Sequence, residues 1–350
     1  MTFRHTTTAL LGALLLLLEG SSSAMAKVPT ARYMPVFADV NIVVAQAAST
    51  PLRIVRKSGT RAVPRSTSPI VAPKPHIVVP QAPPVPVTPE PPVLETASNG
   101  QQYYRGFTVP VELLDSIKTY VDQHEQYVAL PDVLGAVSHS VSDPSLRAAG
   151  VQELIGVSYQ TFTDWSPDRK DNIALAMQVL DGLWVAPGQR VSYNHLIGEV
   201  SARTGYKRTK IILNSAEQWG IGGGVCQSST AAYQVAFNTG LQINERRNHT
   251  YWYPEYYLDG MDATTYTGSP DMVFTNTSGN PVLLQVVMRE NQIYTLAYGT
   301  PFAVVQAERT SRSGNKWNGL TTSWRRTVTP FYGEATDETF TSRYRGQNYL

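Results

Sequence analysis

The chain has one cysteine among its 350 residues, a formal net charge of only +2, and no apolar run long enough to cross a membrane as a helix. A single thiol excludes an intramolecular disulfide and any cysteine-rich metal site. The small net charge excludes the strongly basic field typical of nucleic-acid-binding proteins. The longest apolar run, Ala9–Leu18, is shorter than the about 20 residues that a spanning helix needs. We therefore expect no nucleic-acid partner and no stable membrane span.

The N-terminus has the features of a secretory signal peptide over residues 1–26. Arg4 and His5 form a weakly basic start, an apolar run follows, and Ala24–Ala26 is a small-x-small cleavage site. Glu19 at the end of the apolar run is atypical and leaves open an uncleaved signal that acts as a short anchor. We predict Sec-type export and an extracytoplasmic location, in the periplasm or the cell wall. A lone thiol is at risk of oxidation there, so its retention needs a reason.

Residues 27–101 differ in composition from a folded domain, because eleven of the 24 prolines lie between Pro64 and Pro92. Such a run lacks the backbone N–H groups that helices and sheets require and favours extended polyproline II conformation. We predict a semi-rigid spacer that lets a folded part work at a distance from the membrane.

Three helices are predicted before the strands begin. Apolar residues at spacings of three and four indicate helices over 110–127 and 130–141, within a small helical segment at 102–151. The clearest helix is capped at or near Asp171 and ends at Gly182. Its predicted inward side chains are Ile173, Ala176, Met177 and Leu180.

Short strands predominate from Val191 onward. The predicted strands cover 207–214, 241–256, 271–290 and 292–300, with turns at 278–280 and 290–291 and a hairpin within 325–344. One helix interrupts them at 228–239 and is closed by Gly240. The pattern predicts an α+β fold: a mixed or antiparallel sheet with a central helix that follows a glycine-rich cysteine loop, preceded by a small helical segment.

The lone cysteine, Cys226, stands two residues after the consecutive glycines Gly222, Gly223 and Gly224, at the start of the central helix. Free N–H groups and the positive end of a helix dipole stabilise a thiolate at such a position. The glycines leave room for a substrate and allow backbone N–H groups to point at an oxyanion, and we assign Gln227 to the same loop. The alternative interpretation is a small buried cysteine behind a tight turn.

The preferred base for this thiol is His249. A helix of about 14 residues rises roughly 21 Å, and a return strand of about eight residues covers roughly 26 Å. An antiparallel arrangement therefore returns His249 to the level of Cys226, as a thiol–imidazole pair requires. His195 is a rival base. The remaining histidines that we considered, His76, His124 and His139, lie in the spacer or the helical segment, and no pair has ligand spacing, so we expect no metal and no cofactor.

An acidic residue that orients the base is Asp262 or Glu245. On a strand, Glu245 and His249 lie about 13 Å apart, which is too far for a hydrogen bond, so we prefer Asp262. The residues beside the histidine that are candidates to line a groove for a peptide or a sugar are Arg246, Arg247, Tyr251, Trp252 and Tyr253. From these and the central helix we select Arg246, Tyr251 and Tyr233 as substrate-binding residues.

These residues together resemble the signature of the VanW family, which is named for an accessory protein of vancomycin resistance clusters. The matching features, in order, are Gly222 to Gly224, Cys226-Gln227, Ser229-Thr230, Tyr233, Gly240-Leu241, Glu245-Arg246, His249, Asp262-Ala263-Thr264, and Phe274 with Asn276. The resemblance covers Gln152 to Thr300. We place the family domain at 152–305 and a C-terminal β extension at 306–350.

The resemblance implies a cysteine enzyme that acts on peptidoglycan stem peptides. Members of the family have been linked to L,D-transpeptidation, in which Cys226 would form a thioester and a second stem would resolve it as a 3–3 cross-link. Water as the acceptor would make the enzyme a carboxypeptidase instead, and a thiol endopeptidase uses the same residues. A non-catalytic wall-binding or assembly factor is a further alternative.

The chain departs from the family pattern in two respects. Ala231-Ala232 stands where the family usually has Thr-Leu, and the residues after His249 are unusually aromatic. We find neither peptidoglycan-binding repeats nor a G5 module. The Ser-His-Gly-x-Cys motif of the better-known cysteine L,D-transpeptidases is also absent, so a shared chemistry would rest on a different scaffold.

Overall fold

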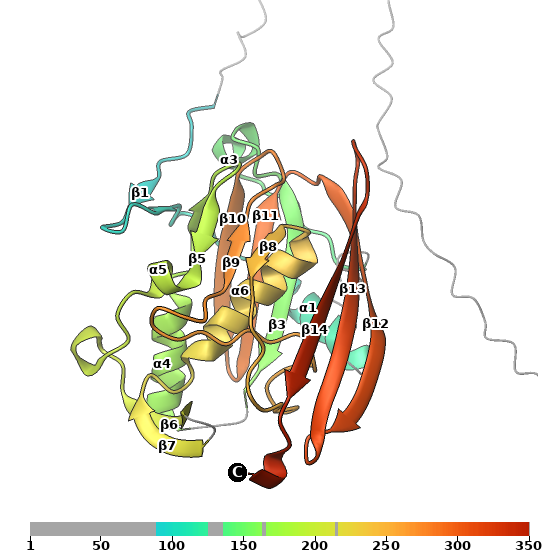
Figure 1. Ribbon diagram of the computed structural model, residues 1–350. Helices are drawn as coiled ribbons and strands as arrows, with labels where there is room; N and C mark the ends of the chain where they lie inside the picture. Colours follow the sequence, from blue (N-terminus) through green and yellow to red (C-terminus); the bar gives the residue numbers. More distant parts are fainter. Residues whose placement is uncertain (1–88, 125–135, 163–165, 214–215, 350) are drawn as a thin grey trace, which may run out of the picture. The chain divides into compact units, whose positions relative to one another are not determined.

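An antiparallel sheet lies at the centre of the computed structural model, which describes residues 89–124, 136–162, 166–213 and 216–349 (Figure 1). Within these residues the sheet has six strands, in the spatial order β1 (Glu95–Thr96), β2 (Gln102–Tyr103), β4 (Leu183–Val185), β10 (Val282–Arg289), β11 (Gln292–Gly299) and β3 (Glu153–Thr161). All described residues belong to one compact unit, Ile77–Leu350. The predicted signal peptide, most of the spacer and residues 130–135 of the helix expected at 130–141 lie outside the described residues. The end of that expected helix is wrong, because residues 137–141 are not helical.

Both faces of this sheet are covered. On one face, α1 (Val111–Gln123) and α3 (Pro144–Ala148) pack against β3 and β11 through a cluster that includes Leu114, Ile117 and Leu296. On the other face, α6 (Val225–Thr239) packs against the same two strands. Strands β3 and β11 are therefore buried on both sides, which explains why their burial is continuous rather than alternating along the strand.

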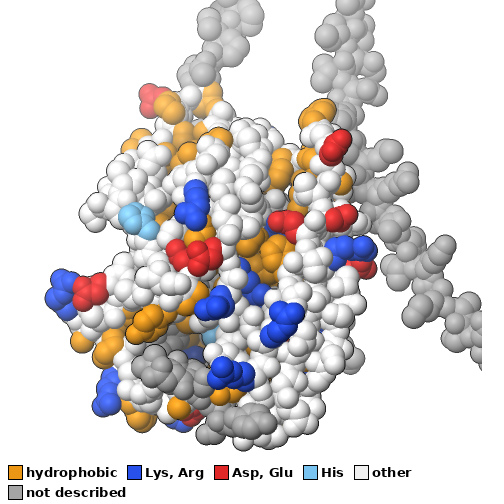
Figure 2. Space-filling model, viewed as in Figure 1, with side chains coloured by type: hydrophobic (Ala, Val, Ile, Leu, Met, Phe, Trp, Pro, Cys, Tyr) orange, Lys and Arg blue, Asp and Glu red, His pale blue; other side chains and the backbone are white. Residues whose placement is uncertain are grey.

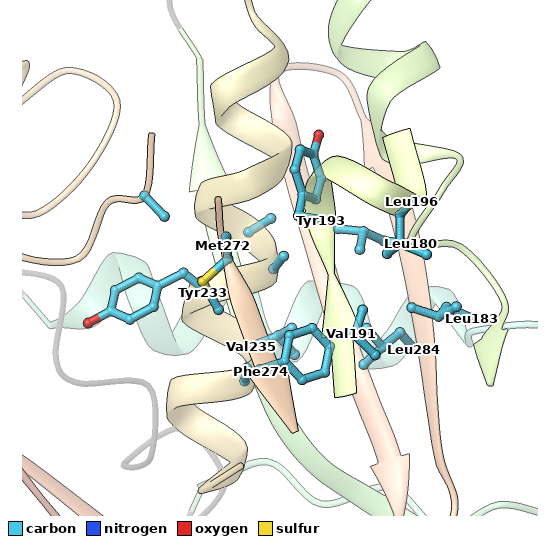
Figure 3. Packing of buried hydrophobic residues seen from close by; sticks show 14 of the residues in the cluster. Leu180, Leu183, Val191, Tyr193, Leu196, Tyr233, Val235, Met272, Phe274 and Leu284 are labelled. Atoms are coloured by element: carbon cyan, nitrogen blue, oxygen red, sulfur yellow. The ribbon is translucent and has the colours of Figure 1, made fainter. Parts of the chain in front are cut away.

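The larger core lies between the sheet and α6. Figure 3 shows side chains from several elements that converge there, including Leu180, Leu284 and Val235. The helix approaches the sheet closely at Gly156 of β3, where a Cβ atom would lie 1.9 Å from Thr239 Oγ1. Only glycine fits at that position, so the depth of α6 on the sheet depends on it.

Smaller elements surround this core (Figure 1). They are α4 (Pro167–Met177) and α5 (Tyr193–Ile197), the 3₁₀ turns Ala202–Thr204 and Gln347–Tyr349, the hairpin of β6 (Arg208–Leu213) and β7 (Ala216–Ile221), the sheet of β5 (Arg190–Ser192), β9 (Val273–Thr275) and β8 (Gln242–Glu245), and the sheet of β12 (Ala303–Asn315), β13 (Gly319–Pro330) and β14 (Thr336–Tyr344). The β12–β14 sheet lies beside α6. Arg326 of β13 donates to the carbonyl oxygens of Phe237 and Leu241 at the C-terminal end of that helix, at 3.1 and 3.0 Å.

The predicted α+β class is confirmed. Helix α6 is followed by Gly240 at φ +83°, the left-handed conformation that a glycine C-cap adopts. The two-residue turn at 290–291 is confirmed as well, with Glu290 at φ 56° between β10 and β11.

Two local expectations are wrong. Helix α4 begins at Pro167 with Ser166 as its N-cap, and Asp171 lies inside the helix. Proline is favoured at the first helical position because its missing N–H group has no partner there in any case. The strand expected over 241–256 ends at Glu245, and an irregular segment follows.

The face seen in Figure 2 carries Lys and Arg side chains interspersed with Asp and Glu side chains. Within the described residues, none of the helices combines the length and the apolar character that crossing a membrane requires.

Candidate functional site

Cys226 is the second residue of α6 and the only one of its fifteen residues that is not buried. Gly224 caps the helix at φ +108°, and the thiol lies in the first turn, between Val225, whose N–H donates to Gly222 O at 3.1 Å, and Gln227, whose N–H donates to Gly224 O at 2.9 Å. The positive end of the helix dipole therefore acts on the sulfur. The helix presents this one side chain to the surface and packs the rest of its length into the core.

The three glycines before Cys226 are required by the backbone path. Gly222 and Gly224 have φ of +83° and +108°, which side-chain-bearing residues rarely adopt. At Gly223 the limit is space, because a Cβ atom would lie 2.1 Å from Thr209 Oγ1 and 2.3 Å from the carbonyl oxygen of Lys210. The glycine triplet thus lets the chain pass tightly against β6 before it enters α6.

Buried polar side chains fix the position of α6 along its whole length. Their hydrogen bonds run from Ser228 Oγ to Ala176 O (2.9 Å), from Ser229 Oγ to Ala263 O (2.7 Å), from Gln234 Nε2 to Met261 O (2.8 Å) and from Asn238 Nδ2 to Val157 O (2.7 Å). Two of these four acceptors belong to the segment 261–263, which also contains Asp262. The helix that carries the thiol therefore holds the chain around the carboxylate as well.

His249 and Asp262 are joined by two hydrogen bonds. The backbone N–H of His249 and its ring atom Nδ1 both lie 2.6 Å from Asp262 Oδ2. Because Nδ1 contacts the carboxylate, the other ring nitrogen is left to face the thiol. The ring also stacks on Tyr257, with centroids 5.1 Å apart and an angle of 20° between the planes.

Asp262 is completely buried, and its second oxygen, Oδ1, has partners of its own. Arg246 Nη2 lies 3.1 Å from Oδ1, and the hydroxyl of Tyr344 donates to the same oxygen. The Arg246 side chain is only 5% exposed and also donates to the backbone oxygen of Asp262 at 2.6 Å. The buried carboxylate is therefore ion-paired and fully hydrogen-bonded, which a buried charge requires.

The electrostatics of these groups favour a charged pair. Burial raises the pKa of Cys226, but the hydrogen bond and the positive charge of His249 outweigh it and lower that pKa from 9.0 to about 7. Burial lowers the pKa of His249, but the hydrogen bonds to Asp262 and Cys226 outweigh it and raise that pKa from 6.5 to about 9. Between pH 7 and 9 the site thus favours a thiolate beside an imidazolium.

The Asp262 carboxylate stays ionised throughout this range. Burial alone would raise the pKa of Asp262, but the hydrogen bond from His249 and the charge of Arg246 hold it below its ordinary value. Next to the sulfur, Cys226 Sγ lies 3.7 Å from Thr264 Oγ1 and 3.6 Å from the carbonyl oxygen of Thr265. The segment after Asp262 thus forms one wall beside the thiol.

Cys226 and His249 lie in a cleft of about 890 Å³. Its side chains include five tyrosines, at 251, 253, 256, 257 and 266, and the cations Arg169, Lys210 and Arg247. Arg169 lies 5.3 Å above the ring of Tyr256. The volume is in the range of small-molecule and peptide sites, and the lining combines flat aromatic surfaces with charges of both signs, since Glu217 and Glu255 line the cleft as well.

The predicted site residues fall into two groups. Gly223, Gly224, Gln227 and Tyr251 line the cleft with Cys226 and His249. Gln227 also donates from Nε2 to the carbonyl oxygen of Thr161 at 3.2 Å.

Tyr233 and Arg246, which we expected to bind substrate, lie elsewhere. Tyr233 is fully buried against Phe237, and Arg246 is directed at Asp262, 4.9 Å from the Tyr233 ring. The rival base and the rival acid lie apart from the thiol as well. His195 Nε2 is 3.2 Å from the carbonyl oxygen of Asn99, and Glu245 accepts from the backbone N–H of Asp271 at 2.9 Å.

Three contributors escaped the sequence analysis: the Tyr344 hydroxyl, the stacking ring of Tyr257 and the wall formed by Thr264 and Thr265. The Asp-Ala-Thr motif was the one available signal for the wall, since Thr264 is its last residue. Nothing in the sequence links Tyr344 to Asp262 across 82 positions. Within the described residues, no group of three or more His, Cys, Asp or Glu side chains is arranged to hold a metal ion.

Comparison with known proteins agrees with this site. Residues 168–298 match the family model described as VanW like protein. The chain is 33% identical over 143 residues to the uncharacterized protein YoaR of Bacillus subtilis (strain 168), and 30% identical over 126 residues to the vancomycin B-type resistance protein VanW of Enterococcus faecalis (strain ATCC 700802 / V583). These alignments cover 41% and 35% of this chain and 47% and 46% of the relatives.

The chain thus spans about half the length of the curated relatives it matches. No solved structure matches it significantly. The matched residues 168–298 include the glycine triplet, the thiol, the imidazole and the carboxylate. The resemblance inferred from the sequence is confirmed over residues 168–298, which match the VanW family model.

Proposed function

We propose that this protein is an exported cysteine acyltransferase that acts on peptidoglycan stem peptides, most simply as an L,D-transpeptidase. The observation that carries the proposal is the arrangement of Cys226 and His249 in one cleft, with the buried Asp262 behind the imidazole, a thiol pKa of about 7 and an imidazole pKa of about 9. Thiolate, base and orienting carboxylate are the three parts of a nucleophilic acyl-transfer site. The name of the Enterococcus relative, a vancomycin resistance protein, supports a role at the cell wall.

In the first half of the proposed reaction, the Cys226 thiolate attacks the carbonyl carbon between residues three and four of a stem peptide. The positive end of the α6 dipole stabilises the oxyanion of the tetrahedral intermediate. The C–N bond then breaks, and the imidazolium of His249 gives its proton to the departing amine of D-alanine. A thioester on Cys226 and a neutral His249 remain.

In the second half, the side-chain amine of another stem peptide attacks the thioester. His249 takes a proton from this amine, the C–S bond breaks, and the new amide bond is the 3–3 cross-link. The thiolate and the imidazolium are regenerated. Water in place of the amine gives a carboxypeptidase. The cations and tyrosines of the cleft suit a peptide that carries carboxylate groups.

The test is muropeptide analysis of sacculi incubated with the full chain or with Cys226→Ser. The proposal predicts 3–3 cross-linked dimers with the wild type alone, and tripeptides in their place if water is the acceptor. Tyr332→Phe serves as a matched control, because this tyrosine is 92% exposed and is not among the residues that line the cleft. Identical profiles for the wild type and Cys226→Ser would refute an enzymatic role and leave the wall-binding alternative.

A further inference from the structure

The loop that carries Asp262, residues 259–262, is hydrogen-bonded to the β12–β14 sheet and packs against it. This sheet lies C-terminal to the family match at 168–298. Trp324 Nε1 of β13 donates to the carbonyl oxygen of Asp259 at 2.8 Å, and Arg309 Nη1 of β12 donates to its carboxylate at 3.0 Å. Gly260 packs so closely on Trp324 that a Cβ atom would lie 2.6 Å from the indole. Backbone and side chains of the loop therefore both rest on this sheet.

Strand β14 reaches the carboxylate itself. The Tyr344 hydroxyl accepts a hydrogen bond from the backbone N–H of Gly260 at 2.8 Å and donates its own proton to Asp262 Oδ1. Ser342 Oγ, two residues earlier on the strand, accepts from Arg246 Nη1 at 2.7 Å. Both side chains that hold Oδ1 are thus anchored by one strand, while Oδ2 serves His249.

We propose that Tyr344 is a positioning residue for the His249–Asp262 pair, supplied by the C-terminal sheet. Its hydroxyl fixes the rotation of the Asp262 carboxylate, so that Oδ2 stays directed at Nδ1 of His249 and the ring keeps its other nitrogen toward Cys226. This inference rests on the proposed thiol chemistry. Burial and the adjacent carboxylate raise the pKa of Tyr344, so the phenol remains a proton donor across the working pH range.

The electronic and the positional effects of this hydroxyl have opposite signs. Removing a donor concentrates negative charge on the carboxylate, which would favour the imidazolium and lower the pKa of Cys226 further. Releasing the rotation of the carboxylate weakens the His249 contact and raises the pKa of Cys226. The ionisable groups that face this pair are Arg246, Cys226, Tyr233, Tyr257 and Tyr344. The substitution Tyr344→Phe removes one hydroxyl group from this set and keeps the aromatic ring that fills the site.

The experiment is a pH titration of Cys226 alkylation by iodoacetamide, on the full chain, for the wild type and Tyr344→Phe. We expect the midpoint to rise by about one pH unit, so that alkylation below the midpoint slows about three- to fourfold once the greater nucleophilicity of the more basic thiolate is included. Tyr332→Phe, the same change at a 92% exposed tyrosine between β13 and β14, should leave the midpoint in place. An unchanged or lower midpoint in folded Tyr344→Phe would overturn the proposal.

His249→Ala in the same titration separates this inference from the proposed function. If the wild-type midpoint is that of a free cysteine and His249→Ala does not move it, the thiol chemistry itself fails. If His249→Ala raises the midpoint but Tyr344→Phe does not, only the positioning role fails. Should Tyr344→Phe not fold by circular dichroism, Ser342→Ala replaces it, because that change releases Arg246 from β14. A midpoint unmoved in Ser342→Ala then counts against the proposal.

Discussion

His249→Ala is the most direct perturbation of the charged pair. The pKa of Cys226 is about 7 instead of 9.0 because the hydrogen bond and charge of His249 outweigh burial. The variant removes both favourable contributions and keeps the burial. We therefore expect the pKa of Cys226 to reach 9 or more.

The size of the effect follows from the ionised fraction. At pH 7 the thiolate falls from about one half of the molecules to about 1% or less, a decrease of about 50-fold. A more basic thiolate is also a better nucleophile. With a Brønsted slope of about 0.4–0.5, a pKa that is two units higher makes the thiolate react roughly six- to tenfold faster, which offsets part of the loss. The net decrease in alkylation rate at pH 7 should be about five- to eightfold, with the midpoint of the profile displaced to high pH.

The assay is iodoacetamide labelling followed by intact mass, from pH 5 to 10. Cys226 is the only thiol in the chain, so each added mass reports this site alone. The wild type should rise through pH 7 and inflect again near pH 9, where His249 loses its proton. His195→Ala is the matched control, because that ring contacts Asn99 instead. A wild-type midpoint near 9, shared by His249→Ala, would refute the reasoning.

Two further predictions concern stability, measured by urea denaturation. Gly223→Ala places a Cβ 2.1 Å from Thr209 Oγ1 and should cost about 1–3 kcal/mol or more, and an unchanged midpoint would show that the glycine loop is not packed as described. Arg326→Met removes a 1% exposed guanidinium that pairs with Glu338 and donates to two carbonyl groups at the end of α6. We expect a loss of about 3–5 kcal/mol. The adjacent exposed Arg325→Met should change stability by less than about 1 kcal/mol, and equal losses would contradict the burial argument.

The sequence predicts best where local chemistry decides the structure. Gly240 has a backbone angle that other residues avoid, so the C-terminal end of α6 was predicted correctly, whereas the helix begins at Val225 and not at Ser228 as expected. Strands β3 and β11 are both buried on two faces, but only β11 was predicted, because the turn at 290–291 marks its start. A helix end or a strand is predicted correctly where neighbouring residues, such as a glycine or a turn, mark its boundary.

The route to His249 was predicted incorrectly, although the pairing with Asp262 was the preferred choice. We expected a continuous strand, but the chain leaves β8 at Glu245 and the backbone then bonds to other segments, as from Thr264 N to Arg247 O at 2.8 Å. His249 is placed by side-chain and loop contacts rather than by strand geometry. Such contacts join residues distant in the sequence, and no spacing rule finds them.

The buried polar bonds of α6 have a consequence for how this protein loses activity. Ser228, Ser229, Gln234 and Asn238 bond the helix to three separate segments of the core, around Ala176, Val157 and 261–263, so the helix cannot detach while the rest stays folded. Cys226 therefore lies in the part of the protein that unfolds last. Heat or denaturant should abolish thiol reactivity and the fold in one cooperative step, with no folded but misaligned intermediate in between.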